Sequence, residues 1–151
     1  MYRHIGILIV DDSNDDCFLL TRAFQNAGIN ARLDCLSTGQ SAMEFLLGKG
    51  AHADRRVPML ILLDLKMPGI NGFEVLEWLR KQPNLRNLPV LILSSSNLPE
   101  DVDRAHELGC NAYLAKPFGR EALCRLVSSI EAFWLRQHVF PSCCGKMGEM
   151  P

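Results

Sequence analysis

The chain of 151 residues has no long hydrophobic run and almost no net charge. No apolar stretch approaches the roughly 20 residues that a membrane-spanning helix needs, and no basic-then-apolar leader is present. The formal net charge of -1 provides no general electrostatic attraction to nucleic acid or to an anionic membrane. We therefore expect a cytoplasmic protein that binds neither nucleic acid nor a membrane.

The chain also has no Cys-x-x-Cys pair, although it contains six cysteines. Four of them fall in or beside expected helices and strands, where a reduced thiol behaves as a small apolar side chain. Cys143 and Cys144 lie in the C-terminal tail, where redox activity, metal binding and the lack of any role all stay open. In a compartment that keeps thiols reduced, we predict free thiols at the other four: Cys17, Cys35, Cys110 and Cys124.

Five short apolar runs alternate with segments of helical periodicity. The expected strands cover residues 5–10, 31–36, 59–63, 90–93 and 112–115. Helices are expected from Asp12 or Ser13 to Gly28, over 38–47, from Asn71 or Gly72, from Pro99 to Gly109, and over 119–137. Such alternation gives parallel strands joined by right-handed crossovers. We predict an α/β fold, a doubly wound (βα)5 sheet with the strand order 2-1-3-4-5.

Polar side chains follow four of these strands directly. Asp11 and Asp12 end the first strand and Asp64 ends the third, and these two strands meet at the switch point of the predicted sheet. Three crowded carboxylates repel one another unless they share a cation, and Mg²⁺ suits such a site. An aspartate beside Mg²⁺ can act as a nucleophile toward phosphorus.

Ser94 and Lys116 end the fourth and fifth strands, where they provide a hydroxyl and an ammonium for a phosphoryl group. Each residue alone has an ordinary structural interpretation. The acids and the serine can cap helices, the lysine can be a solvated surface charge, and Tyr113 can be a partly exposed strand aromatic. Their joint placement at consecutive strand ends favours a phosphoryl pocket.

Four sequence motifs in order carry a family resemblance. They are IVDD at 9–12, LLDLKMPG at 62–69, LILSS at 91–95 and GCNAYLAKPF at 109–118. With these motifs the chain resembles the receiver domain of two-component response regulators. The resemblance implies a flavodoxin-like receiver fold over residues 4–137, followed by a flexible tail over 138–151.

The resemblance assigns roles to the acidic residues. Asp64 would be the phosphoacceptor. Asp11, Asp12 and Asp64, together with the backbone carbonyl of Lys66, would bind Mg²⁺.

The remaining pocket positions also match the family. Ser94 would be the switch hydroxyl and Lys116 the phosphate-binding lysine, while Tyr113 matches an aromatic that moves inward on activation. The Lys116–Pro117 bond would be a cis peptide, as an X-Pro bond in a tight turn can be.

Three variable positions flank the pocket and would tune hydrolysis of the phosphoryl group: Lys66, Ser95 and Ser96. The Lys66 side chain either folds over the phosphate or points to solvent, and the sequence leaves both open. Ser95 is small enough to leave the site open.

The expected function is that of a single-domain response regulator, which is not an enzyme beyond catalysing its own phosphorylation and dephosphorylation. It would accept phosphate from a sensor histidine kinase or a histidine phosphotransfer protein and signal through a protein-binding face. The long segment before the third strand and the pair Phe133-Trp134 resemble the regulators paired with bacterial phytochromes. Phe133, Trp134 and Phe140 could also form a homodimer contact, with core packing of Phe133 as the alternative.

Two other interpretations remain. A phosphatase of the haloacid dehalogenase type needs a second aspartate two residues after the nucleophile, where this chain has Lys66. A receiver-shaped interaction module that has lost phosphorylation is the other, although all five pocket residues are present.

Overall fold

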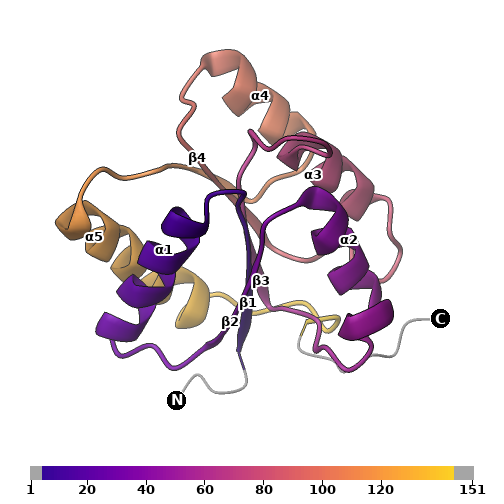
Figure 1. Ribbon diagram of the computed structural model, residues 1–151, viewed down its shortest axis with the longest axis horizontal. Coiled ribbons are helices and arrows are strands. Elements are labelled where there is room, and N and C mark those ends of the chain that lie inside the picture. Colours follow the sequence, from indigo (N-terminus) through magenta and orange to yellow (C-terminus); the bar gives the residue numbers. More distant parts are fainter. Residues whose placement is uncertain (1–4, 145–151) are drawn as a thin grey trace.

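The structure is a computed structural model that describes residues 5–144. Strands and α-helices alternate along this part of the chain (Figure 1). The elements are β1 (Gly6–Val10), α1 (Asn14–Asn26), β2 (Arg32–Leu36), α2 (Gly39–Leu47), a 3₁₀ turn (Gly50–His52), β3 (Leu60–Leu63), α3 (Gly72–Arg80), β4 (Val90–Ser94), α4 (Pro99–Glu107), β5 (Ala112–Ala115), α5 (Arg120–Ile130) and a π-helical segment (Glu131–Leu135).

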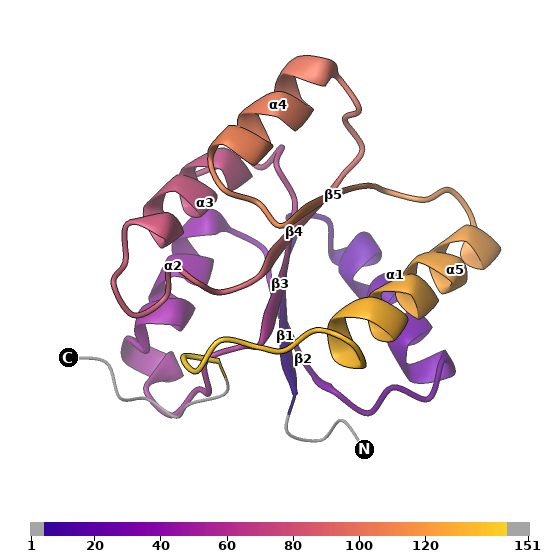
Figure 2. The ribbon, with the colours of Figure 1, turned by 180° about the vertical axis from the view of Figure 1, so that it is seen from behind.

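The five strands form one parallel sheet in the order β2-β1-β3-β4-β5, which confirms the predicted topology. Helices α1 and α5 cover one face of the sheet, and α2, α3 and α4 cover the other (Figures 1 and 2). Since both faces are covered, the central strands are buried throughout and read as continuous apolar runs.

Side chains along a strand point alternately to the two faces of the sheet, and each face has its own hydrophobic core. Ile7 and Ile9 of β1 pack with α1 and α5, whereas Leu8 and Val10 pack with the helices on the opposite face. All four side chains are at most 2% exposed. The two cores hold the central strands rigidly, so the residues that follow β1, β3 and β4 start from well-determined positions.

Side-chain caps decide where two helices begin. The Ser13 hydroxyl accepts a hydrogen bond from the Asp16 backbone N–H at 3.2 Å, so Ser13 caps α1. Asn71 caps α3 in a reciprocal box: its side chain accepts from the Glu74 N–H at 3.0 Å, and the Glu74 carboxylate accepts from the Asn71 N–H at 3.2 Å. Of the alternatives left open by the sequence, these two residues are the N-caps.

The last helix differs from the predicted span of 119–137. The α-helical part ends at Ile130, and the chain continues to Leu135 as a π-helical segment. There the Arg136 N–H donates to the Glu131 carbonyl at 3.1 Å, a bond that spans five residues rather than four. The apolar stripe of the sequence indicated a helix here, but its periodicity does not distinguish these two hydrogen-bonding patterns.

The beginning of the expected flexible tail makes contacts with the domain. His138 lies with its ring centroid 4.7 Å from that of Trp134 and 4.9 Å from that of Phe140. Cys143 and Cys144 pack, partly buried, against the core beneath α2 and α3. Residues 145–151 lie outside the described residues.

The connection between α2 and β3 contains a buried arginine that the sequence did not single out. The Arg55 guanidinium donates to the carbonyls of Phe45 at 2.7 Å and Leu46 at 2.6 Å. These are among the last carbonyls of α2, which have no partner within the helix. Arg55 therefore ties this long connection to the end of the helix.

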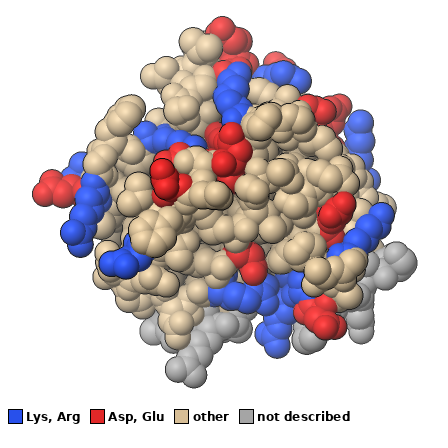
Figure 3. Space-filling view, viewed as in Figure 1, with Lys and Arg blue, Asp and Glu red and all other residues tan. Residues whose placement is uncertain are grey.

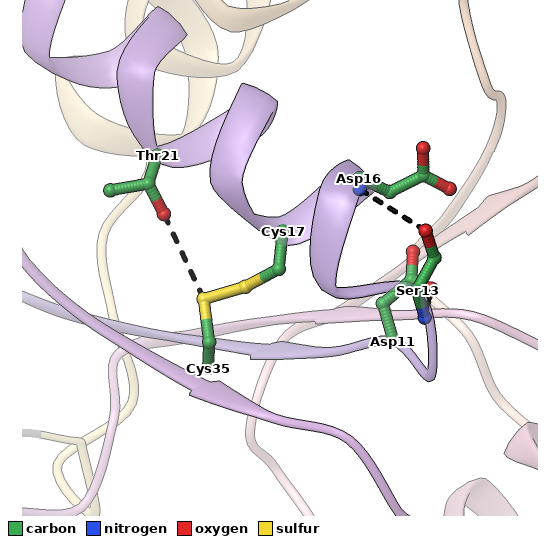
Figure 4. Close-up of a disulfide and its surroundings, with 6 residues drawn as sticks. All are labelled: Asp11, Ser13, Asp16, Cys17, Thr21 and Cys35. Carbon is green, nitrogen blue, oxygen red and sulfur yellow. Dashed lines mark hydrogen bonds between the residues drawn. A yellow bond between two sulfur atoms is a disulfide. The ribbon is translucent and has the colours of Figure 1, made fainter.

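A disulfide between Cys17 and Cys35 corrects the prediction that both thiols are free. Cys17 lies in α1 and Cys35 in β2, and their Cα atoms are 6.5 Å apart (Figure 4). The residues are 18 positions apart in the sequence, so only the packing of α1 beside β2 brings them together. Cys110 and Cys124 are free, as predicted.

The described helices include none that is both long enough and apolar enough to cross a membrane. On the face shown in Figure 3, acidic and basic side chains are interspersed, with large areas between them that carry neither.

Candidate functional site

Three carboxylates converge at the carboxyl edge of the sheet. Asp11 and Asp12 follow β1, and Asp64 follows the neighbouring β3. Backbone hydrogen bonds extend the sheet to these positions: the Asp11 N–H donates to the Leu36 carbonyl at 3.0 Å, and the Asp64 N–H to the Val10 carbonyl at 2.9 Å. One ligand oxygen from each acid lies within 4.8 Å of the others. The acidic group is therefore one site, at the predicted switch point.

Lys116 reaches the same site from the end of β5. Its Nζ lies 2.7 Å from Asp11 Oδ2 and 3.6 Å from Asp64 Oδ2. A third carboxylate oxygen, Oδ2 of Asp16 in α1, is 3.0 Å away. Sequence reasoning did not include Asp16, because an acid in the first turn of a helix normally has an explanation in the helix dipole.

Burial, together with the neighbouring acids, makes Asp64 costly to ionise. Burial raises the pKa of the Asp64 carboxyl to about 6, the Lys116 charge opposes this rise, and the charges of Asp11 and Asp12 add to it. For Lys116, burial alone lowers the pKa, but hydrogen bonds to Asp11 and Asp16 and the charge of Asp64 outweigh it, so its pKa is raised. Lys116 is therefore a fixed positive charge among acids that a single ammonium does not balance.

Ser94 and Tyr113 lie on β4 and β5, the two strands that follow β3 across the sheet. Ser94, the last residue of β4, is fully buried, and its Oγ accepts a hydrogen bond from the Ser96 N–H at 3.1 Å. The Tyr113 hydroxyl donates to the Ser96 carbonyl at 2.7 Å. Ser95, which lies between Ser94 and Ser96 in the chain, is exposed. Ser96 thus connects the two side chains through the loop that follows β4.

A family model for the response regulator receiver domain matches residues 7–128. The chain belongs to this family. Response regulator Rcp1 of Synechocystis sp. is 37% identical over 136 residues, a match that covers 90% of this chain and 92% of Rcp1. The probable methanogenesis regulatory protein FilR2 of Methanothrix harundinacea is 38% identical over 130 residues, covering 85% of this chain and 83% of FilR2.

Solved structures of receivers superimpose on the whole sheet. The Mn²⁺-bound form of Rcp1 has a TM-score of 0.84 at 36% identity and covers 91% of this chain and 99% of its own. The phosphorylated cyanobacterial phytochrome response regulator RcpA has a TM-score of 0.87 at 34% identity. This match covers 92% of this chain and 99% of the RcpA chain. The family implies a phosphodonor partner such as a histidine kinase or a phosphotransfer protein, and a receiver is not an enzyme in the usual sense.

The acidic pocket of this receiver suits a divalent cation. Its donors are carboxylate oxygens, which hard cations prefer, and two of the three acids are at most 7% exposed. Three carboxylates share one ammonium here, so their negative charge exceeds what Lys116 balances, and the charges of Asp11 and Asp12 add to the burial that raises the pKa of Asp64. A divalent cation would remove this excess.

Of the two positions that the sequence left open for Lys66, the structure is nearer to the second, because the side chain is exposed to solvent while it pairs with α4. Its Nζ forms an ion pair with Asp101 Oδ2 of α4 at 3.2 Å and lies 5.7 Å from the centroid of the Phe73 ring. The same Asp101 oxygen accepts a hydrogen bond from the Ser96 hydroxyl at 2.6 Å. Lys66 and Ser96, both singled out as tuning positions, therefore meet at a carboxylate that sequence reasoning missed.

The peptide bond between Lys116 and Pro117 is trans, which corrects the expected cis bond; all described peptide bonds are trans. The trans form of an X-Pro bond is favoured by about 0.5–1 kcal/mol. Lys116 reaches the acids in this form while its own N–H donates to the Ser94 carbonyl at 2.8 Å.

Proposed function

We propose that Asp64 accepts a phosphoryl group from the phosphohistidine of a sensor histidine kinase or of a histidine phosphotransfer protein. One observation carries this proposal: Lys116 Nζ bridges Asp11 at 2.7 Å and Asp64 at 3.6 Å at the edge of the sheet where β1, β3 and β5 end. This arrangement supports the proposal because a carboxylate able to act as the nucleophile, other acids able to bind a cation, and an ammonium able to bind phosphate all lie within one group of ion pairs.

The proposed cation is Mg²⁺, held by Asp11, Asp12, Asp64 and the backbone carbonyl of Lys66. When bound, it supplies positive charge that offsets the charge of the phosphoryl oxygens. The RcpA and Rcp1 relatives were solved in phosphorylated and Mn²⁺-bound forms, which supports both parts of the proposal.

In the transfer step, an Asp64 carboxylate oxygen attacks phosphorus and the P–N bond to the donor imidazole breaks. The electron pair of that bond stays on the imidazole nitrogen, and the phosphoryl group becomes an acyl phosphate on Asp64. The Lys116 ammonium, already 3.6 Å from Asp64, exchanges part of its contact with the acids for a contact with the phosphoryl oxygens.

The response would begin at Ser94. Its hydroxyl accepts a hydrogen bond from the Ser96 N–H, so a rotation of Ser94 that lets the hydroxyl donate to the phosphoryl group would alter this contact with the loop. Because the Tyr113 hydroxyl is bound to the carbonyl of Ser96, movement of this loop also alters what holds Tyr113. The face formed by α4, β5 and α5 would then carry the signal to a target protein.

We further propose a phytochrome-type kinase as the donor, because RcpA is named as a phytochrome response regulator. The homodimer contact is proposed at Phe133, Trp134 and Phe140, where the Phe133 side chain is 54% exposed. Sedimentation velocity compares wild type with Phe133→Ala, and an unchanged mass would argue against this contact.

Labelling with a small acyl phosphate tests the proposed function. With Mg²⁺ present, intact-mass spectrometry should detect one added phosphoryl group per chain. Chelation by EDTA should slow labelling by roughly a hundredfold or more, because a bound cation contributes several kcal/mol of charge stabilisation. Adding back Mg²⁺ is the control and should restore the rate. If EDTA does not change the labelling rate, Mg²⁺ has no role in the reaction. If the folded protein is not labelled at all, the phosphorylation-independent interaction module is favoured.

The ion pair of Lys66 predicts a shorter phosphoryl lifetime in Lys66→Ala. Removing the side chain frees Asp101 from its ion pair and removes a positive charge two residues from Asp64 that could interact with the phosphoryl group. A partly exposed ion pair contributes up to about 1 kcal/mol, so the lifetime should fall roughly two- to fivefold. Decay of the labelled protein after donor removal measures it.

Lys81→Ala is the matched control, since it breaks the exposed pair with Glu77 in α3. An unchanged or longer lifetime in Lys66→Ala, or an equal fall in both variants, contradicts the prediction.

A further inference from the structure

We propose that the Cys17–Cys35 disulfide is a reversible thiol–disulfide exchange site whose closed form holds the segment carrying Asp11 and Asp12 in place. Opening the disulfide should also change how readily Asp64 accepts a phosphoryl group, and only this expectation rests on the proposed function. The cross-link and its connection to the acids are features of the fold itself.

The two cysteine residues differ in exposure. Cys17 faces the core beneath α1 and is 8% exposed, whereas Cys35 is exposed on β2, the edge strand of the sheet. Figure 4 shows the bond crossing from the inner side of α1 to this strand. A thiol from solution would therefore attack from the side of Cys35, the exposed residue of the pair, rather than from the side of Cys17.

On the strand side, the disulfide is one residue away from a bond that positions Asp11. Leu36, which follows Cys35, accepts the Asp11 N–H at its carbonyl oxygen with a distance of 3.0 Å. Because β2 is an edge strand paired only with β1, this end of the strand has no second neighbour to hold it. The disulfide supplies that missing restraint.

On the helix side, the connection passes through Ser13. The Cys17 N–H donates to the Ser13 carbonyl at 3.1 Å, and the Ser13 N–H donates to Asp11 Oδ1 at 2.9 Å. The neighbouring Asp16 forms an ion pair with Lys116 at 3.0 Å. The cross-link thus closes a loop whose two ends both lie against the residues that build the acidic pocket.

Exchange with a low-molecular-weight thiol such as glutathione accounts for both the opening and the closing of the disulfide. A first thiolate attacks the Cys35 sulfur, forms a mixed disulfide there and releases Cys17, which takes up a proton. A second thiol displaces Cys35, so that two thiols become one small disulfide while the protein gains two thiols. A glutathione disulfide reverses both steps.

Thr21 is placed to assist this exchange. Its Oγ1 lies 3.7 Å from the Cys35 sulfur, as the dashed line in Figure 4 shows. A disulfide sulfur has no proton, so in the closed form the hydroxyl is the donor. The same hydroxyl can donate to the Cys35 thiolate that the second thiol releases, which makes Thr21 a positioning residue for the exchange.

The test compares the full chain in oxidised and reduced glutathione buffers. Thiol labelling read by peptide mass reports the state of the pair, and hydrogen exchange reports the backbone around residues 11–17. A titration with Mn²⁺ alone, followed by the signal of the free ion, reports the affinity of the pocket. We expect reduction to increase exchange over this segment and to weaken Mn²⁺ binding roughly tenfold, as loss of outer support of metal ligands does.

Cys35→Ser should behave as the reduced protein in both buffers, and it should fold because the side chain is exposed. Cys124→Ser, which changes a free cysteine in α5, should follow wild type. The proposal is overturned if glutathione does not reduce the pair in the folded protein, or if exchange and Mn²⁺ affinity are the same in both states. If both respond but neither state accepts phosphate at Asp64, the proposed function fails and the exchange site stands.

Discussion

Asp64→Asn is expected to abolish phosphoryl labelling while leaving the fold intact. The amide has the same shape as the carboxylate but is not a nucleophile, so no acyl phosphate can form. Stability should not fall, because burial already raises the pKa of the Asp64 carboxyl to about 6, which means that its charge is costly in the folded state. Labelling by an acyl phosphate with Mg²⁺, read by intact mass, measures the first effect, and urea unfolding measures the second.

Asp103→Asn is the matched control, since Asp103 is exposed on α4 away from the acidic pocket. It loses one negative charge, as Asp64→Asn does, but should label like wild type. Normal labelling of Asp64→Asn would show that another residue is the acceptor. Loss of labelling in both variants would mean that overall charge, rather than the nucleophile, controls the reaction.

Gly72→Ala should destabilise the protein by roughly 3 kcal/mol, at the upper end for overpacking. Gly72 is the first residue of α3, and its N–H donates to the Leu65 carbonyl at 3.0 Å. A Cβ atom there would overlap the backbone oxygen of Asp64 and lie 2.8 Å from the Cα of Leu65. Both neighbours are backbone atoms that cannot rotate away, so either α3 or the end of β3 must shift.

The shift would also displace Asp64 from Lys116, so labelling should slow along with the loss of stability. Gly6→Ala is the control, because the Cβ there meets only the Arg32 guanidinium, at 2.9 Å, and this flexible side chain can move. Its effect should be about 1 kcal/mol or less. Urea unfolding measures the stability of both variants, provided that the dependence of the unfolding free energy on urea is the same as in wild type. Equal urea midpoints for Gly72→Ala and Gly6→Ala would contradict the prediction.

The Lys66–Asp101 pair and the Ser96–Asp101 hydrogen bond give α4 a direct connection to the pocket. The Ser96 hydroxyl is the largest cause of the lowered pKa of Asp101, so this acid is charged over the physiological range. A phosphoryl group near Lys66 would compete with Asp101 for the lysine. If Asp64 accepts phosphate as proposed, the start of α4 would therefore respond through Lys66 as well as through Ser94.

The sequence alone determined the sheet and the residues at its carboxyl edge. Apolar runs such as 60–63 are short and uninterrupted because a parallel strand is buried on both faces, and the acids that follow them mark the switch point. The N-caps of α1 and α3 were each narrowed to two neighbouring residues, because capping depends on the local sequence.

Only the tertiary structure decided which distant side chains meet. The pairing of Cys17 with Cys35 depends on how α1 packs beside β2, and the pairing of Lys66 with Asp101 depends on where α4 lies relative to the loop that follows β3. Neither position is set by periodicity or by spacing, because both arise from contacts between separate elements. The pocket itself was predictable because its residues follow strands whose order is the common one for a doubly wound sheet of five strands, whereas its supports come from helices whose placement only packing decides.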